Sequence, residues 1–326
     1  MHQGMLPEWA SHERVWIGFP SDPAAWGEPL AEAQRQIAAF ANAVHDGGRG
    51  ETVHLIAKGV DATARARDLC DAGVIVEDRL IGDVWLRDTG CIITGSGAGR
   101  VARNFGFNGW GNRFDYEGDQ TIGRELAQAA GFRVTDCGWI LEGGSIDVDG
   151  KGLAVTTVDC LLNPNRNPTL DRAAIEARLA RDLGIDRLLW LGDGLANDHT
   201  DGHIDNLARF VAPNQLVLPE ARDADDPNAA VYADARRRAE AFGCKVTPLP
   251  SVGRFEQDGE AVPASYMNFY IGNSAVVVPV YGSKYDEDAL SALEPLFPKR
   301  KIIGLRADAV LTGGGSFHCS SQQVPL

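Results

Sequence analysis

Leu141-Glu142-Gly143-Gly144-Ser145-Ile146 is the segment from which the fold of this chain can be inferred, because it ends an apolar run with an acid and two glycines. The run Trp139 to Leu141 that leads into it has the composition of a strand. Glycine lets a backbone approach a ligand closely, and a carboxylate at the end of an apolar strand seldom lies buried without a partner. The segment therefore predicts a strand whose end faces a polar pocket.

Four other segments also combine a strand-like piece with a polar or glycine-rich end: Asp83-Val84-Trp85-Leu86-Arg87-Asp88, Gly202-His203-Ile204-Asp205-Asn206, Tyr266-Met267-Asn268-Phe269-Tyr270 and Gly313 to Cys319. The starts of the five segments lie about 45 to 65 residues apart, which is the scale of one strand-helix-strand unit. A ring of such units would bring the polar ends to one central pocket. We therefore expect a pseudo-symmetric repeat, although the identity between the units is low.

Hydrophobic periodicity predicts short strands that alternate with amphipathic helices, which is an α/β or α+β pattern. The expected strands are 53–57, 74–76 and 84–94, and the expected helices are 60–72, 119–131, 169–183, 227–242 and 286–296. No linker interrupts the chain, and the charged stretch Glu220 to Asp226 is typical of a surface loop. We expect one compact domain over residues 1–326.

Composition excludes several classes of protein. The chain has 326 residues, of which 44% are hydrophobic, and lacks the run of about 18 apolar residues that spans a membrane. Charged residues near its start do not fit a signal peptide, so we expect a cytoplasmic protein. Six cysteines without a CxxC spacing argue against a zinc ribbon, a redox pair or a structural disulfide.

The formal net charge is −14, from 45 acidic and 31 basic residues. No basic cluster of the kind that neutralises phosphates is present, so nucleic acid is not an expected partner. An acidic surface attracts cationic small molecules, but it also serves solubility, and the composition favours the solubility interpretation.

Cys319 is the candidate nucleophile, because it follows a glycine run and precedes small polar residues. The alternative is a small buried hydrophobic residue beside a turn. A thiol of pKa about 8.5 is only a few per cent thiolate at pH 7 and needs a base or a positive charge, for which His203 is the leading candidate. On a strand His203 and Asp205 would share one face, whereas His318 would point away from the face of Cys319.

Asp88 and Glu142 are two further candidate site residues. The alternatives are an ion pair with a local arginine or a turn cap for Asp88, and a turn-stabilising side chain for Glu142. With Asp205 they would form an acidic pocket for a cation. A guanidinium fits such a pocket, because it is planar and permanently charged, and its paired N–H groups match carboxylates. A thiolate attacking its central carbon would give deimination through a covalent amidino group.

Several motifs from residue 5 to 323 resemble the agmatine deiminases of the Porphyromonas-type peptidylarginine deiminase family, within the guanidine-modifying superfamily. These motifs are Met5-Leu6-Pro7-Glu8-Trp9, His12-Glu13-Arg14, Trp85 to Gly90, Asn108-Gly109-Trp110-Gly111, Glu142 to Ser145, Cys160 to Pro168, Thr200 to Asn206, Pro263 to Tyr270 and Gly313 to Cys319. The resemblance implies a five-bladed, pentein-like α/β propeller in one domain, with no metal and no organic cofactor. A homodimer is compatible with this resemblance.

The resemblance also implies residue roles. Cys319 would be the nucleophile, His203 the general acid and base, Asp88 and Asp205 the carboxylates that hold the guanidinium, and Glu142 a further acidic partner. Trp85 would line the substrate pocket. The implied reaction converts agmatine and water to N-carbamoylputrescine and ammonia, a step towards putrescine and other polyamines, and the implied partner is a small cationic guanidine.

One position departs from the family pattern. Agmatine deiminases usually carry Glu two residues before the position of Asp201, and this chain has His199 there. In the family that acid lies towards the terminal amine of the substrate, so we count His199 among the substrate-binding residues. The alternatives are a deiminase of arginine, peptidylarginine, acylated agmatine or a guanidine bearing a carboxylate.

Three rival interpretations remain open. The cluster Asp198, His199, Asp201, His203 and Asp205 contains potential ligands for a metal-dependent hydrolase. A guanidine-binding protein without activity, and an enzyme that transfers the amidino group to an amine, are the others. Four residues either shape the pocket or hold turns, and they are not counted as catalytic: Asn108, Trp110, Asn165 and Arg166.

Overall fold

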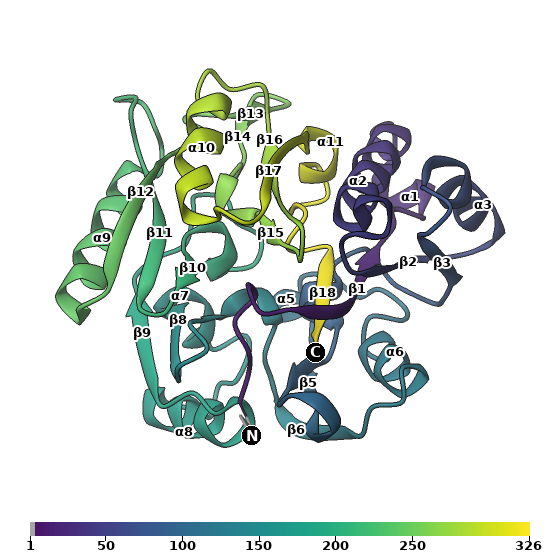
Figure 1. Ribbon diagram of the computed structural model, residues 1–326. Helices are drawn as coiled ribbons and strands as arrows, with labels where there is room; N and C mark the ends of the chain where they lie inside the picture. Colours follow the sequence, from purple (N-terminus) through teal and green to yellow (C-terminus); the bar gives the residue numbers. More distant parts are fainter. Residues whose placement is uncertain (1–3) are drawn as a thin grey trace.

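One pattern of three strands occurs in five sheets of the computed structural model, which describes residues 4–326 (Figure 1). In each sheet the first strand runs antiparallel to the second, and the second runs parallel to the third. The chain is thus mixed α/β, and its sheets repeat one topology as the spacing of the five segments predicts.

The strands of the five sheets, in sheet order, are as follows. They are β18 (Ser321–Pro325), β1 (His12–Gly18), β2 (Thr52–Ala57) and β3 (Ile75–Asp78); β4 (Ile92–Thr94), β5 (Val101–Gly106) and β6 (Val134–Ile140); β7 (Asp147–Val148), β8 (Leu153–Thr157) and β9 (Arg187–Leu191); β10 (Arg209–Ala212), β11 (Gln215–Glu220) and β12 (Lys245–Pro250); β15 (Tyr270–Ile271), β16 (Ala275–Val280) and β17 (Lys301–Arg306). A separate hairpin consists of β13 (Glu256–Gln257) and β14 (Glu260–Ala261).

Helices make the crossovers between parallel strands, which a tight hairpin turn cannot join. These helices are α2 (Leu30–His45), α3 (Val60–Leu69), α6 (Ile122–Ala129), α8 (Arg172–Leu183), α9 (Ala229–Phe242) and α10 (Asp286–Leu293). Figure 1 shows them on the outside of the molecule, around the sheets. Each helix buries an apolar stripe, for example Ile37, Phe40 and Val44 of α2, as the 3.6-residue period requires.

Short helical turns make up the remaining elements. They are α1 (Pro23–Trp26), α4 (Leu86–Thr89), α5 (Gly109–Asn112), α7 (Val158–Leu161), α11 (Asp308–Leu311), η1 (Asp46–Gly48), η2 (Gly97–Gly99), η3 (Gly143–Ser145), η4 (Ile204–Asn206), η5 (Tyr266–Asn268) and η6 (Glu294–Leu296). The turns α4, η3, η4 and η5 each precede the first strand of a sheet, and a turn at 317–320 precedes β18.

The five polar segments are therefore turns that lead into strands, and the prediction that they are strand-like is wrong in this detail. The predicted strand 84–94 is likewise α4 followed by β4. A segment of three or four residues is too short to show a helical period, so its apolar residues could not be distinguished from a strand. The turn still delivers its polar side chains to the start of a sheet.

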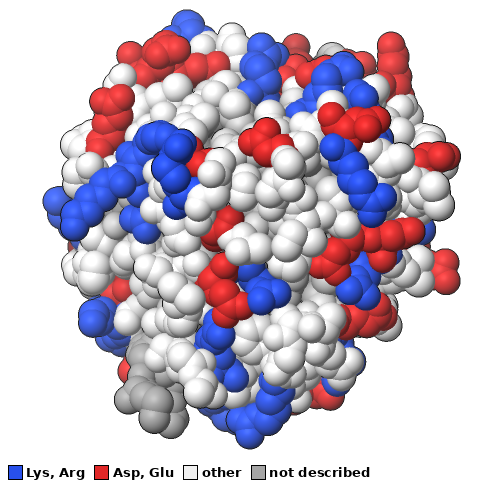
Figure 2. All heavy atoms as spheres, turned by 45° about the vertical axis from the view of Figure 1, so that its right-hand side comes forward, with Lys and Arg blue, Asp and Glu red and all other residues white. Residues whose placement is uncertain are grey.

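The two ends of the described chain meet in one sheet, where β18 pairs with β1. The largest apolar cluster includes residues of β1, β2, α2 and β16. Of three smaller clusters, two lie among β4 to β11, and one joins β1, β2 and β18 to β4, β5 and α6. On the face in Figure 2, basic and acidic side chains are interspersed. Among residues 4–326, no helix has the length and apolar composition to cross a membrane.

Candidate active site

The thiol of Cys319 lies in the turn before β18 and is buried. Its Sγ accepts a hydrogen bond of 2.9 Å from Asn268 Nδ2 in η5, and it lies 3.4 Å from Asp205 Oδ2 in η4. Burial, together with the negative charges of Asp205 and Asp88, raises the pKa of Cys319 well above its ordinary value. The thiol form is thus favoured until a cation offsets these carboxylates.

Asp88 belongs to α4 and is held by two donors. Its Oδ1 accepts a bond of 2.9 Å from the N–H of Gly144, and its Oδ2 accepts one of 2.9 Å from Trp110 Nε1. Burial raises the pKa of Asp88. The carboxylate is fixed in position and faces the same cavity as Cys319.

Asp205 lies in η4 and is completely buried. Its Oδ2 forms a hydrogen bond of 2.7 Å with His318 Nδ1. The other ring nitrogen of His318, Nε2, forms one of 2.7 Å with Glu8 Oε2. Burial alone raises the pKa of Asp205, but the hydrogen bond and charge of His318 outweigh it and hold that pKa below its ordinary value. Asp205 Oδ1 has no hydrogen-bond partner within the described chain. One carboxylate oxygen is therefore available to a ligand.

Gly144 packs where the side chains of Asp88, His203 and Asp205 converge. A Cβ at this position would lie 2.6 Å from His203 Nδ1, 2.9 Å from Asp88 Oδ1 and 3.1 Å from Asp205 Oδ2. The first two distances are shorter than real Cβ contacts, so a side chain here would force its neighbours to move. The glycine of η3 thus allows the carboxylate of α4 and the two polar groups at η4 to come together.

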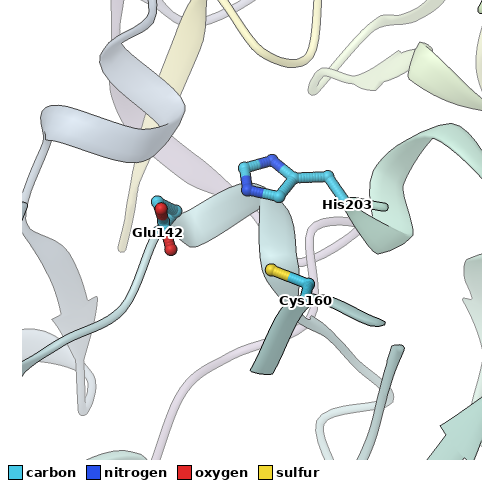
Figure 3. Close-up of side chains that lie close together, drawn as sticks. All are labelled: Glu142, Cys160 and His203. Atoms are coloured by element: carbon cyan, nitrogen blue, oxygen red, sulfur yellow. The ribbon is translucent and has the colours of Figure 1, made fainter. Parts of the chain in front are cut away.

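His203 directly precedes η4, Glu142 precedes η3 and Cys160 belongs to α7, and Figure 3 shows the three side chains pointing to a shared space. Their potential ligand atoms lie within 4.8 Å of one another, so they could hold a metal ion. Neither His203 ring nitrogen, nor Glu142 Oε2, has a hydrogen-bond partner among residues 4–326. The other oxygen of Glu142, Oε1, accepts a bond of 2.7 Å from Arg166 Nε.

The surroundings of His203 favour its protonated form. Its Nδ1 lies 3.7 Å from Asp88 Oδ2. Burial lowers the pKa of His203, but the negative charge of Asp88, with Cys160 and Glu142, raises it well above its ordinary value. An imidazolium at this position can donate a proton to a departing group.

A cavity opens onto Cys319. It is lined by Asp83, Trp85, Asp88, Trp110, Phe114, Tyr116, His199, Thr200, Gly313, Gly314, Gly315 and Cys319. Of the residues predicted from the sequence, Cys319, Asp88, Trp85 and His199 line it. His203, Asp205 and Glu142 are not among the lining residues, but Asp205 lies next to the thiol and His203 next to Asp88.

Two expectations about orientation are wrong. His203 and Asp205 do not share the face of a strand, because η4 is a helical turn. His318 does not point away from the site, since its ring holds the same carboxylate oxygen that lies 3.4 Å from the Cys319 thiol. Both errors follow from treating turns as strands.

The cluster at 198–205 is dispersed over separate partners. His199 lines the cavity, whereas Asp201 pairs with Arg113 and Arg166. Within residues 4–326, the one group of His, Cys, Asp and Glu side chains close enough for a metal ion is Glu142, Cys160 and His203. The geometry therefore gives no support to a metal site built from the 198–205 cluster.

The sequence did not assign roles to several residues that hold the site. Asn268 contacts Cys319, Trp110 contacts Asp88, and Arg166 contacts Glu142. Trp110 has a φ of 53°, which is uncommon outside glycine, and it lies between Gly109 and Gly111, whose φ angles are also positive. The motifs contained these residues, but only their contacts across sheets show what they hold.

Comparison with known proteins finds a matching family and similar relatives over nearly the whole chain. The family model described as Porphyromonas-type peptidyl-arginine deiminase matches residues 4–325. The agmatine deiminase of Stutzerimonas stutzeri is 34% identical in an alignment that covers 98% of this chain and 95% of that protein.

Two solved structures are similar as well. A cysteine-to-serine variant of the C. jejuni agmatine deiminase with substrate bound has a TM-score of 0.90 at 31% identity, covering 98% of this chain and 96% of that one. The agmatine deiminase of Enterococcus faecalis has a TM-score of 0.92 at 30% identity, covering 99% and 96%. On these matches in sequence and structure, the chain belongs to the Porphyromonas-type peptidyl-arginine deiminase family.

Proposed function

We propose that this protein is a cysteine-dependent deiminase that converts agmatine and water to N-carbamoylputrescine and ammonia. The observation that carries the proposal is the position of the Cys319 thiol, at a cavity wall beside the buried carboxylates of Asp88 and Asp205. Relatives that are 31–34% identical to this chain are named agmatine deiminases, and the structure of one of them holds substrate. A small cationic guanidine is therefore the proposed partner.

Binding of the guanidinium would activate the thiol. We place the cation between Asp88, which lines the cavity, and Asp205, whose Oδ1 has no partner among residues 4–326. Each carboxylate can accept N–H groups of a guanidinium. Those two carboxylates are the charges that keep the Cys319 thiol protonated. A bound cation offsets them, lowers the pKa of the thiol and lets it release its proton.

The covalent half-reaction uses His203 as an acid. The thiolate forms a bond to the guanidine carbon and gives a tetrahedral adduct. The His203 imidazolium then donates a proton to one NH₂ group, the C–N bond breaks, and ammonia leaves. Cys319 now carries an amidino group and His203 is neutral.

The second half-reaction uses His203 as a base. Neutral His203 takes a proton from a water molecule while the oxygen of that water forms a bond to the amidino carbon. The C–S bond breaks, the thiolate is restored, and the hydroxyl proton is lost to solvent, which leaves the carbamoyl product. Asp88 is the main acidic partner that keeps His203 charged between turnovers, and Glu142, held by Arg166, adds to its effect.

We further infer that the five sheets form a pentein-like, five-bladed propeller in one domain that spans residues 1–326, of which 1–3 lie outside the described residues. The shared strand order of the sheets supports this arrangement. The named relatives support a place in putrescine synthesis. A cytoplasmic location, function without a cofactor or nucleic acid, and assembly as a homodimer complete the proposal.

The test measures ammonia release from agmatine, arginine, peptidylarginine and acylated agmatine at equal concentration. We expect turnover of agmatine, with N-carbamoylputrescine identified by mass spectrometry, and none by Cys319→Ala. Added EDTA should leave the rate unchanged, because the proposed steps use only side chains and water. Turnover that survives Cys319→Ala, or that EDTA abolishes, would contradict the proposal.

A further inference from the structure

The substrate cavity carries a carboxylate at each of two positions, and all its other lining residues are aromatic, small, hydroxyl-bearing or His199. Asp88 lies at the Cys319 end. Asp83 is the second acid, and no Lys or Arg lines the cavity. An apolar cavity with two separated anions matches a ligand that has two cationic ends and an aliphatic spacer.

Trp85 sets the separation of the two ends. Its indole Nε1 donates a bond of 2.9 Å to Asp83 Oδ2. The six-membered ring of the same indole lies against Gly315, where a Cβ would be 2.6 Å from Trp85 Cζ3 and 3.0 Å from Cys319 Cβ. Asp83 thus lies at the five-membered ring of the indole, and the Cβ of Cys319 lies near its six-membered ring.

The indole offers a surface for the aliphatic spacer of the substrate. The guanidine carbon and the ammonium nitrogen of agmatine are separated by six bonds, about 7 Å when the chain is extended. A four-carbon chain lying along the face of Trp85 would therefore bring its ammonium to Asp83 when its guanidine carbon faces Cys319. Phe114 and Tyr116 complete the aromatic wall beside it, and aromatic faces attract cations.

Asp83 has a free acceptor position and, among the described residues, no counter-ion. Its Oδ1 accepts bonds from Trp26 Nε1 at 3.0 Å and Val84 N at 2.8 Å, and its Oδ2 accepts only that of Trp85. A carboxylate offers about four acceptor sites, so one on Oδ2 remains. Among residues 4–326 Asp83 forms no ion pair, and its surroundings include the acids Asp22 and Asp119. Burial raises its pKa, as expected of a carboxylate without a counter-ion.

We propose that Asp83 binds the terminal ammonium of the substrate and selects unbranched guanidines with a cationic amine about four carbons away. This inference rests on the proposed deiminase function. Asp83 gives the terminal amine an acidic partner. This chain has His199 at the position where agmatine deiminases usually carry a glutamate for that amine. Asp83 is thus a specificity residue at the far end of the cavity, remote from the reacting carbon.

The test compares agmatine with n-butylguanidine, which has the same spacer and no amine, in the wild type and Asp83→Asn. We expect the variant to raise KM for agmatine by about 30-fold or more, with kcat changed only a few-fold. It should lower kcat/KM for butylguanidine far less, because the amide oxygen still accepts the bonds of Trp26 and Val84 and only the bond of Trp85 is lost. Asp22→Asn is the matched control, because Asp22 is close to Asp83 but does not line the cavity and its cap to Ala24 N is retained by Asn.

A structural role of Asp83, acting through Trp85, would lower kcat/KM for both substrates equally, and that result would overturn the inference. So would an unchanged KM for agmatine. If Asp83→Asn does not fold, the wild type alone decides through guanidines with three-, four- and five-carbon amine tails, of which the four-carbon tail must be preferred. Absence of Cys319-dependent turnover of all these compounds would instead overturn the proposed function.

Discussion

Asn268 is the residue with the most direct contact to the Cys319 sulfur, and its amide favours the thiolate. A hydrogen bond to a charged group contributes about 1.5–3 kcal/mol, which corresponds to about one to two pKa units. Replacing Asn268 by Ala should therefore raise the pKa of Cys319 further and lower the rate of ammonia release about 10- to 100-fold. The pH dependence of Cys319 alkylation by iodoacetamide, followed by mass spectrometry, measures the shift.

The control for this prediction is Asn104→Ala, since Asn104 lies on β5 and bonds Asp136 on β6, not the Cys319 thiol. Its alkylation profile should match that of the wild type. An Asn268→Ala profile that does not move to higher pH would show that the amide does not stabilise the thiolate.

Asp119 is a second residue with a measurable consequence, in this case for stability. Burial raises its pKa to about 7, while its Oδ1 accepts the N–H groups of Gly82 and Asp83. In the unfolded chain an Asp titrates near pH 3.9, so between about pH 4 and 7 the folded state binds a proton that the unfolded state lacks. The contribution of Asp119 is full below pH 4 and is lost as pH rises through 7, on the order of 4 kcal/mol.

Asp119→Asn should remove this dependence, because the amide oxygen still accepts both N–H bonds and carries no charge. Urea unfolding at pH 5 and pH 8 measures it. We expect the wild type to lose more stability than the variant between the two values. Equal losses would mean that Asp119 is ionised at pH 5.

At the level of single residues, the sequence predicted the reacting groups better than their supports. Cys319, His203, Asp88, Asp205 and Glu142 stand in motifs whose chemistry is recognisable one segment at a time, and the fold gathers them, although their roles stay proposals. Asn268 and Trp110 act by contacts with residues 51 and 22 positions away, respectively. No local pattern encodes a contact of that kind, so the structure was needed to find it.

Among the elements, the one-turn helices α4, η3 and η4 carry the site, and η3 is the most constrained. Gly144→Ala would add a Cβ 2.6 Å from His203 Nδ1, so a neighbouring backbone or side chain must move. A displacement of about 1 Å in a catalytic group can cost about 100-fold in rate. We expect a loss of kcat of at least that order with the fold retained, measured by ammonia release and circular dichroism.

Gly99→Ala is the matched control, because a Cβ at that position meets no atom within 4 Å. It should leave kcat unchanged. Near-normal activity of Gly144→Ala would show that the packing around η3 adapts without disturbing His203.

The crossover helices were predictable because they are long enough to show a period. The predicted helix 169–183 is α8 from Arg172, and 227–242 is α9 from Ala229. Their apolar residues recur on one face and their ends carry recognisable caps, such as Asp171 before α8 and Gly243 after α9. Turns of three or four residues show neither signal, which is why the elements that hold the site were assigned to strands.

At the scale of the whole molecule, the pairing of β18 with β1 joins the end of the chain to its beginning. The pairing is reinforced by Arg87 with Gln323, by Arg100 with the carbonyl of Pro325 and by the fully buried Val324. Deleting residues 321–326 keeps every candidate site residue but removes these contacts and exposes an edge of β1. We expect loss of the folded state, seen by circular dichroism and size-exclusion chromatography.

Deleting Leu326 alone is the control, because this residue is 56% exposed. That chain should fold and release ammonia as the full one does. A folded, active chain without residues 321–326 would show that the first sheet closes without its last strand.

The position of Cys319 just before β18 also matters during synthesis of the chain. A ribosome makes the acids and the histidine of the pocket long before it adds the sulfur, which stands just ahead of the final strand. Translation that stops before Cys319 yields a chain without a nucleophile, and translation that stops within β18 yields one that cannot complete its first sheet. The candidate nucleophile is thus the last of the candidate site residues to be synthesised, so no chain shorter than 319 residues can react through it.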